Sequence, residues 1–138
     1  MAKLSAIKAD MSKVEEGQWT TYSAGIQLRI ASTSSTAYRQ ARNDILKPYM
    51  RMTRQRTIDP DRVVELLKPA AARHLLLDWR YIEDENGKAI KYSPEKALEF
   101  FNDPALKDLY DFVLEVAGES ELYRQQAADD EAKNSKTA

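Results

Sequence analysis

Three dipeptides mark the starts of helices along this chain: Asp59-Pro60, Ser93-Pro94 and Asp103-Pro104. Side chains of Asp and Ser accept hydrogen bonds from the free N–H groups of a first helical turn. Proline is tolerated there because its missing N–H has no partner within the helix. The sequence therefore predicts helices that begin near residues 60, 94 and 104. Apolar residues follow each start at helical spacing: Val63, Val64, Leu66 and Leu67, then Leu98 and Phe101, then Leu106, Leu109, Tyr110, Val113, Leu114 and Ala117.

Proline also divides the helices predicted elsewhere. A helix over residues 37–56 follows the run Ser32–Thr36, which offers several N-cap hydroxyl groups. Pro48 lies inside this segment and should kink or divide it. Pro69 should likewise interrupt the helix that begins at residue 60. Helix is predicted again through "AAARHLLLDW", whose most apolar part, Leu75–Leu77, is expected at the centre of the core.

The segment before residue 32 has the alternation of a β-strand. Ile26, Leu28 and Ile30 are separated by polar residues, a pattern that indicates a strand with one buried face. Trp19 lies upstream, and Ser23–Gly25 suits a turn between two strands. With the helices, this ribbon predicts an α+β fold, predominantly α. It comprises an N-terminal antiparallel ribbon, four or five helices and one small hairpin.

The hairpin is expected at residues 82–92, within "DWRYIEDENGKAIKYSPE". Asn86-Gly87 favours a two-residue type I′ turn, because both residues tolerate positive φ. A loop with a single β-bridge is the alternative. A calcium-binding loop with Gly87 at its sixth position would put Ile82 first and Ser93 twelfth, where oxygen ligands and a bidentate Glu are needed. A catalytic pair among Glu83–Glu85 is disfavoured, because solvated carboxylates keep similar pKa values.

Charge is unevenly distributed along a chain whose net charge is −1. Residues 37–56 carry six basic side chains and one acidic one, Asp44, whereas residues 83–131 carry fourteen acidic and five basic ones. The basic helix could contact a nucleic-acid backbone. It could also be a solvated face, or a surface for docking between copies or onto a partner. Nucleic acid is the weakest of these readings, because the tyrosines of this helix lie on its core-facing stripe.

The residues that several classes of chemistry require are missing from the sequence. The chain has no cysteine, and His74 is its single histidine, so thiolate sites and histidine pairs for a metal are excluded. Phosphate-binding glycine loops and metalloprotease motifs are not found. We therefore expect no cofactor or metal, and an enzyme is the least favoured class of function. We also expect no membrane association, since no segment has about 20 consecutive apolar residues.

We divide the chain into a flexible arm at residues 1–14, a single globular domain at 15–124 and a disordered tail at 125–138. The tail sequence, "QQAADDEAKNSKTA", holds no large apolar residue. It could not bury enough apolar surface to offset the loss of conformational entropy on ordering.

From Val14 to Arg124 the chain resembles the tail assembly chaperones of long-tailed, siphovirus-type bacteriophages. The resemblance rests on "EEGQW", on "GIQLRIAS" followed by "AYRQARND", and on "LLLDWRYIEDENGKAIKYSPEKALEFFNDPALKDLYDFVLEVAG". The order of these motifs carries the likeness: a helix ending in Asp-Trp, an acidic turn with a glycine, a Ser-Pro helix start, an Asp-Pro and a final helix.

The resemblance implies a protein that transiently coats the tape-measure protein and recruits tail tube subunits, with self-association between its copies as a further expectation. It would act in the host cell cytoplasm and be missing from the mature virion. The alternative is a small nucleic-acid-binding regulator that uses the basic helix at residues 37–56. For the chaperone we predict a partner-binding surface formed by Tyr38, Tyr49, Met52, Tyr110 and Phe112.

Overall fold

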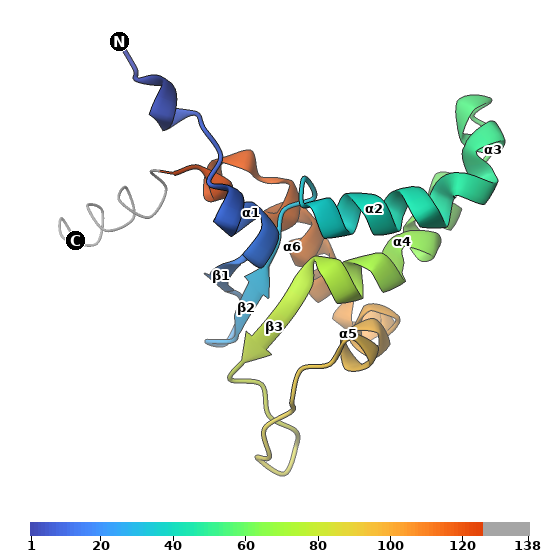
Figure 1. Ribbon diagram of the computed structural model, residues 1–138. Coiled ribbons are helices and arrows are strands. Elements are labelled where there is room, and N and C mark those ends of the chain that lie inside the picture. The colour runs from blue at the N-terminus through green and yellow to red at the C-terminus, as the bar shows by residue number, and fades with distance from the viewer. Residues whose placement is uncertain (126–138) are drawn as a thin grey trace.

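A three-stranded antiparallel sheet packs against a group of helices in the computed structural model, which describes residues 1–125 (Figure 1). The strands are β1 (Gln18–Thr21), β2 (Gln27–Ile30) and β3 (Leu76–Arg80), in the order β1-β2-β3. The longer helices are α2 (Thr36–Leu46), α4 (Pro60–His74), α5 (Pro94–Phe101) and α6 (Lys107–Gly118). The shorter ones are η1 (Leu4–Ala6), α1 (Met11–Glu16), η2 (Lys47–Tyr49), α3 (Met50–Arg54), η3 (Pro104–Leu106) and η4 (Ser120–Tyr123). The predicted α+β class, predominantly α, is confirmed.

The predicted N-terminal ribbon is present, with its expected turn. Strand β1 pairs with β2 from Gln18 opposite Ile30 to Thr21 opposite Gln27. Ala24 and Gly25 connect them with φ angles of 57° and 78°. Positive φ at both central positions is the conformation of a type I′ turn, whose twist matches that of the two strands.

The helix starts are set by the expected caps. The side chains of Asp59, Ser93 and Asp103 each accept a hydrogen bond from a backbone N–H two or three residues on. Asp103 caps the short 3₁₀ turn η3, and α6 follows directly. Ser35 caps α2 in the same way, and Pro48 divides the predicted helix at 37–56 into α2, η2 and α3.

Two predictions about the segment around α4 are wrong. Pro69 lies within α4 and does not interrupt it, so the helix accepts the loss of one backbone hydrogen bond. The helix ends at His74, and Leu75–Leu77 does not continue it. Residues from Leu76 form β3 instead, because their backbone groups pair with β2, from Leu76 opposite Ile30 to Arg80 opposite Gln27. Long-range pairing with β2 outweighs the helical preference of leucine at this position.

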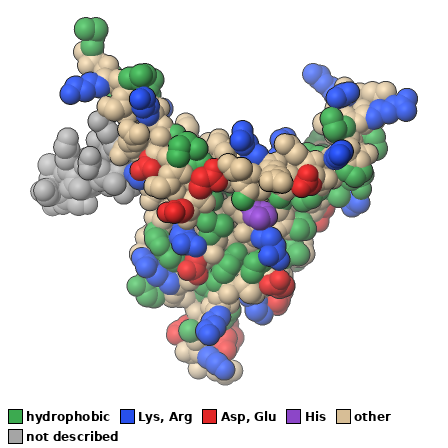
Figure 2. Space-filling view, in the orientation of Figure 1, with side chains coloured by type: hydrophobic (Ala, Val, Ile, Leu, Met, Phe, Trp, Pro, Cys, Tyr) green, Lys and Arg blue, Asp and Glu red, His purple; other side chains and the backbone are tan. Residues whose placement is uncertain are grey.

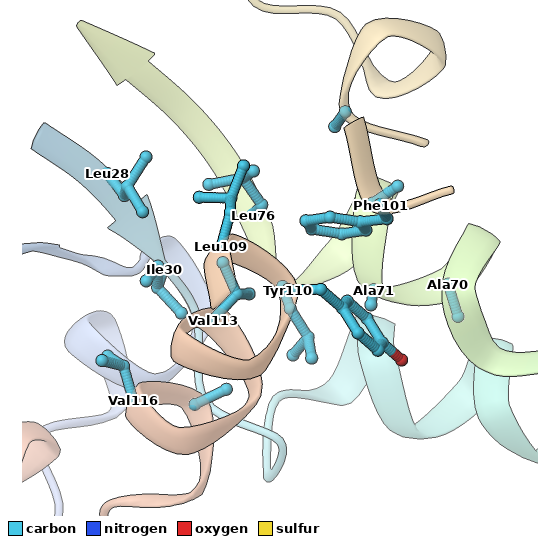
Figure 3. Close-up of a cluster of buried hydrophobic side chains, with 14 of the residues drawn as sticks. Leu28, Ile30, Ala70, Ala71, Leu76, Phe101, Leu109, Tyr110, Val113 and Val116 are labelled. Atoms are coloured by element: carbon cyan, nitrogen blue, oxygen red, sulfur yellow. The ribbon is translucent and has the colours of Figure 1, made fainter. Parts of the chain in front are cut away.

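The core lies between the sheet and helices α4, α5 and α6. Helix α6 turns its apolar face toward β2 and β3, and its Val113 is fully buried. The two inward residues of β2, Leu28 and Ile30, are fully buried as well. Figure 3 shows this cluster, to which the neighbouring helices and strands contribute Ala70, Ala71, Leu76, Phe101, Leu109, Tyr110 and Val116.

The segment expected as a hairpin at 82–92 is a loop closed by one β-bridge, between Glu83 and Ala89. Only Gly87 has positive φ there, so the type I′ turn is wrong. The Asp84 carboxylate accepts hydrogen bonds from the N–H groups of Asn86 and Lys88. This side chain therefore stabilises a different turn, in which Asn86 keeps negative φ.

The ends of the described chain lie beside each other. The N–H of Asp10 donates to the carbonyl of Tyr123 at 2.7 Å, and the N–H of Gln125 donates to the carbonyl of Lys8 at 3.0 Å. Val14, at the end of the predicted arm, is buried. Residues 126–138 of the predicted tail lie outside the described residues, and the disorder predicted there stays a prediction.

We expect Tyr92→Phe to lower the free energy of unfolding by about 1 kcal/mol near pH 7, measured by urea denaturation. The Tyr92 hydroxyl lies 2.9 Å from the carbonyl oxygen of Ala72 and 2.5 Å from that of Leu76, and it links the end of α4 to the following strand. Burial raises the pKa of Tyr92 to about 12. The unfolded chain therefore releases this proton first, and the stabilisation is lost as the pH rises from about 10 to about 12. Wild-type stability should fall more steeply than that of the variant in this range.

Candidate interaction surface

A short basic helix projects from the body of the molecule. We call residues 47–56, which comprise η2, α3 and Gln55-Arg56, the α3 projection. Figure 1 shows α3 extending away from the sheet, beyond the end of α2. Its main packing partner is the adjoining η2. Arg56, with φ of 54°, ends the projection and turns the chain back toward α4.

Two methionines on the projection are open to solvent. Met50 is 46% exposed and Met52 is 42% exposed. A large apolar side chain on the surface loses the stabilisation that burial provides. Methionine is flexible and polarisable, and is common at surfaces that accept partners of varied shape. The tip of the molecule therefore presents adaptable apolar area.

Hollows lie on both sides of the projection. One, with a volume of about 530 Å³, lies between α2 and α3 and is lined by Asn43, Asp44, Leu46, Lys47, Met50, Thr53 and Arg54. The other, of about 460 Å³, lies between α3 and the start of α4 and is lined by Thr53, Arg56, Ile58, Pro60 and Val63. Both hollows are lined in part by apolar side chains, and Met50 belongs to the first. A partner could therefore contact both sides of α3, whereas Met52 lines neither hollow.

Positive charge surrounds this apolar area. All six basic side chains of α2 and the α3 projection are exposed: Arg39, Arg42, Lys47, Arg51, Arg54 and Arg56. None forms an ion pair with an acidic group of residues 1–125. Figure 2 shows blue side chains gathered at the tip that carries α3. The surface therefore suits a partner with both apolar and acidic groups.

Two of the five predicted partner-binding residues belong to the core. Tyr38 and Tyr110 are each only 6% exposed. Tyr110 packs against Phe101 with ring centroids 4.9 Å apart. Burial raises the pKa of Tyr110 to about 12 and also raises the pKa of Tyr38. Tyr38 and Tyr110 therefore offer little of their ring surface to a partner in this conformation.

The other three residues lie on different parts of the molecule. Phe112 is half-buried against Tyr22, with ring centroids 4.8 Å apart, beside the β1–β2 turn. Tyr49 is half-buried in η2, and Met52 is exposed on α3. The five residues therefore do not form one surface, although contact of Tyr49, Met52 or Phe112 with a partner stays a prediction.

Met50 and Leu46 were missing from the predicted surface, because its residues were chosen along one helical stripe that runs through Pro48. In the structure a 3₁₀ turn replaces α-helix at that point. A 3₁₀ turn advances about 120° per residue and an α-helix about 100°, so the faces of α2 and α3 are out of register. The proline itself was the available signal for this change.

Other places that the sequence suggested offer no comparable site. Glu83–Glu85 are exposed on the loop at 82–90, where Asp84 caps its own turn. His74 is half-buried at the end of α4, and its pKa is lowered by burial and then by Arg73. Within residues 1–125, no three His, Asp or Glu side chains are grouped so that they could hold a metal ion. Over the same residues, no helix combines the length and hydropathy of a membrane span.

We expect Tyr38→Ala to lower the free energy of unfolding by about 3–5 kcal/mol, because it leaves a cavity between α2 and α4. Met52→Ala, on the exposed tip, should change it by less than about 0.5 kcal/mol. Urea denaturation of both variants measures the difference. Equal stabilities would contradict the assignment of Tyr38 to the core.

The family model described as "YdaY prophage protein" matches residues 32–134, which is more than half of the 138 residues, and the chain belongs to this family. The expected origin from a phage is thereby confirmed. No curated protein and no solved structure matches the chain.

Proposed function

We propose that this prophage protein is a tail assembly chaperone, which transiently covers the tape-measure protein and brings tail tube subunits to it. The observation that carries the proposal is the α3 projection, which exposes Met50 and Met52 and has a hollow on each side. Membership of a prophage family supports a role in phage assembly. The proposed role involves no catalysis, takes place in the host cytoplasm and ends before the virion is complete.

The physical problem that such a chaperone solves is exposure of apolar surface. A long amphipathic helix that is not yet enclosed by a tail tube presents a continuous apolar stripe to water and tends to aggregate. Proteins cover such stripes by the helix-in-groove mode, in which residues at i, i+3, i+4 and i+7 enter an apolar groove. The hollow between α2 and α3, with Leu46 and Met50 in its wall, is where we place this contact.

The contact must also be reversible, because tube subunits replace the chaperone. Methionine suits this requirement, since its flexible side chain adapts to different sequences. Exposed arginines around the hollow can meet acidic residues of the partner without the desolvation cost of a buried ion pair. Repeated copies along one long partner would then supply avidity from individually modest contacts.

The test is binding to a recombinant helical fragment of the tape-measure protein encoded in the same prophage. We expect a complex in titration calorimetry. Met50→Ser/Met52→Ser should weaken it about tenfold or more, because two side chains lose the free energy of burial. Met11→Ser changes a methionine on α1 that is even more exposed, and it should bind like wild type.

Two results would contradict the proposal. One is no binding of any helical fragment that covers the tape-measure protein. The other is binding that Met50→Ser/Met52→Ser leaves unchanged, which would remove the α3 projection as the site. Circular dichroism of each variant verifies that the fold is retained.

A nucleic-acid-binding regulator is the second candidate, and the exposure of all six basic residues of α2 and the α3 projection favours it. Such a surface can contact phosphates. It offers few stacking groups, however, because Tyr38 is buried and Tyr49 half-buried. Any binding would therefore rest on phosphate contacts and fall steeply with salt.

The chaperone proposal expects duplex DNA to remain free in a gel-shift assay at physiological salt. Any retention at low salt should be no greater than for another protein of similar charge. Retention that is lost in Arg51→Glu/Arg54→Glu and persists in Arg39→Glu/Arg42→Glu would instead identify α3 as a DNA-contacting helix. The two double variants change the net charge equally, so a difference between them locates the contact.

A further inference from the structure

The N-terminal segment carries apolar side chains that nothing covers among residues 1–125. Leu4 is 65% exposed and Ile7 is 63% exposed. They lie three residues apart at the 3₁₀ turn η1, so both project from the same side of the segment. Figures 1 and 2 show the segment extending away from the body, with green and blue side chains along it. We call residues 1–8 the N-terminal arm.

The base of the arm is fixed to the domain. Ala9 forms an isolated antiparallel bridge with Arg124, and the carbonyl of Lys8 and the N–H of Asp10 are also hydrogen-bonded to residues 123–125. Asp10 then caps α1, which is anchored by the buried Val14. The arm is therefore held pointing outward and cannot simply collapse onto the sheet.

The arm is also positively charged. Its charged side chains are Lys3 and Lys8, both exposed, and no acidic residue precedes Asp10. An element with Leu4 and Ile7 on one side and lysines beside them would fit an apolar groove with an acidic rim.

Such a groove lies at the other end of the molecule. It has a volume of about 560 Å³ and runs between α4 and the α5–η3–α6 segment. Its apolar residues are Val64, Phe101, Pro104, Tyr110 and Leu114, and its charged residues are Asp61, Glu65, Asp103 and Asp111 with Lys68 and Lys107.

The charge of the groove is negative, and its lysines are already engaged. Lys68 lies 2.8 Å from a carboxylate oxygen of Glu65, and Lys107 lies 2.7 Å from one of Asp111. Asp61 has no ion-pair partner among residues 1–125. Val64 is 41% exposed at the edge of the groove. The groove thus offers uncovered apolar surface together with an uncompensated carboxylate.

We propose that the N-terminal arm of one copy docks into the acid-rimmed groove between α4 and α6 of a second copy, with Leu4 and Ile7 against its apolar floor and Lys3 and Lys8 near its carboxylates. In Figure 1 the arm extends from one side of the molecule, whereas the start of α4, which borders the groove, lies toward the other side. Contact between two different surfaces is heterologous, so a bound pair still offers one free arm and one free groove. Association of this kind continues into a ring or an open chain of copies.

This head-to-tail contact leaves the α3 projection uncovered. Neither Met50 nor Met52 lines the groove, and neither belongs to the arm. A row of copies could therefore hold a series of α3 projections in register. The inference goes beyond the proposed function and does not depend on it, since self-association can be measured without any partner.

Sedimentation velocity over a range of protein concentrations tests the contact. We expect the wild-type sedimentation coefficient to rise with concentration. Leu4→Ser/Ile7→Ser should weaken association at least tenfold while leaving the fold intact, because both side chains are on the surface. A wild type that stays monomeric at its solubility limit, or a variant that associates like wild type, overturns the proposal.

Charge reversal on each side gives a rescue experiment. Lys3→Glu/Lys8→Glu changes the arm. Asp61→Lys/Glu65→Lys changes two exposed residues of the groove, neither of which caps a helix. Each variant alone should be monomeric, and an equimolar mixture should associate again. Asp108→Lys/Glu115→Lys, at exposed positions of α6 outside the groove, is the matched control and should associate like wild type. Failure of the mixture to associate counts against the pairing of these two surfaces.

The lack of cysteine in the chain permits a direct test of proximity. Copies carrying Ile7→Cys are mixed with copies carrying Val64→Cys under mild oxidation, and the mixed disulfide is followed on a non-reducing gel. This disulfide should form at least tenfold faster than the disulfide between copies carrying Ile7→Cys and copies carrying Thr21→Cys, where Thr21 is an exposed residue of β1. Equal rates would overturn the docking geometry.

These results can be separated from those on the proposed function. The Leu4→Ser/Ile7→Ser variant should still bind the tape-measure fragment through α3 as a monomer. If it binds and wild type does not self-associate, the docking of the arm is wrong and the chaperone role stands. If wild type self-associates through arm and groove and binds no fragment, the docking of the arm stands and the chaperone role is wrong.

Discussion

Strand β2 holds the parts of this molecule together, because it is hydrogen-bonded on both edges and packed on one face. Strands β1 and β3 pair with its two edges, and α6 covers the face that carries Leu28 and Ile30. The hydroxyl of the buried Tyr123 donates to the carbonyl of Ile30 at 2.9 Å. This bond brings η4 against the strand, and η4 in turn places residues 123–125 beside the base of the N-terminal arm. The position of the arm therefore depends on β2, more than 20 residues along the chain.

Stability and recognition are separated in space in this fold. The tyrosines of α2 and α6 that were expected to meet a partner are buried in the core, and the surface that remains is built from flexible or small apolar side chains. Met50 and Met52 lie on a helix that is held mainly by η2. A residue outside the core can adapt to a partner, or be exchanged during evolution, at little cost in folding free energy. For a protein proposed to bind briefly and then leave, this division is physically useful.

Positive and negative side chains are also separated on the surface. Positive side chains are concentrated on α2 and α3, and negative ones surround the groove between α4 and α6. Within each copy, ion pairs join neighbouring residues of one helix, as in Lys68–Glu65 and Lys107–Asp111, or link exposed groups such as Arg73 and Glu95. Such exposed pairs contribute little stability. The separation of charge is therefore better suited to choosing partners and orientations than to holding the fold.

Local signals in the amino-acid sequence were enough to predict where most helices begin and where the first ribbon turns. Asp59, Ser93 and Asp103 cap the helices at the predicted positions, and Ala24-Gly25 supplies the expected turn. These features were predictable because they depend on hydrogen bonds and backbone angles within a few residues. The same is true of Pro48, which divides a helix by removing a local donor.

The remaining features depend on contacts between residues far apart in the chain. Leu75–Leu77 could have continued α4, but the helix ends at His74 and β3 begins at Leu76, because β2 offers an unpaired edge far away in the sequence. Tyr38 was expected on the core-facing stripe of its helix and also, with Tyr110, on the partner-binding surface, and burial between packed helices assigned both to the core. The exposure of Met50, Met52, Leu4 and Ile7 was decided in the same way, by which neighbours the fold brings near and which it does not. The burial of a side chain depends on the residues packed around it, and most of these neighbours are distant in the chain.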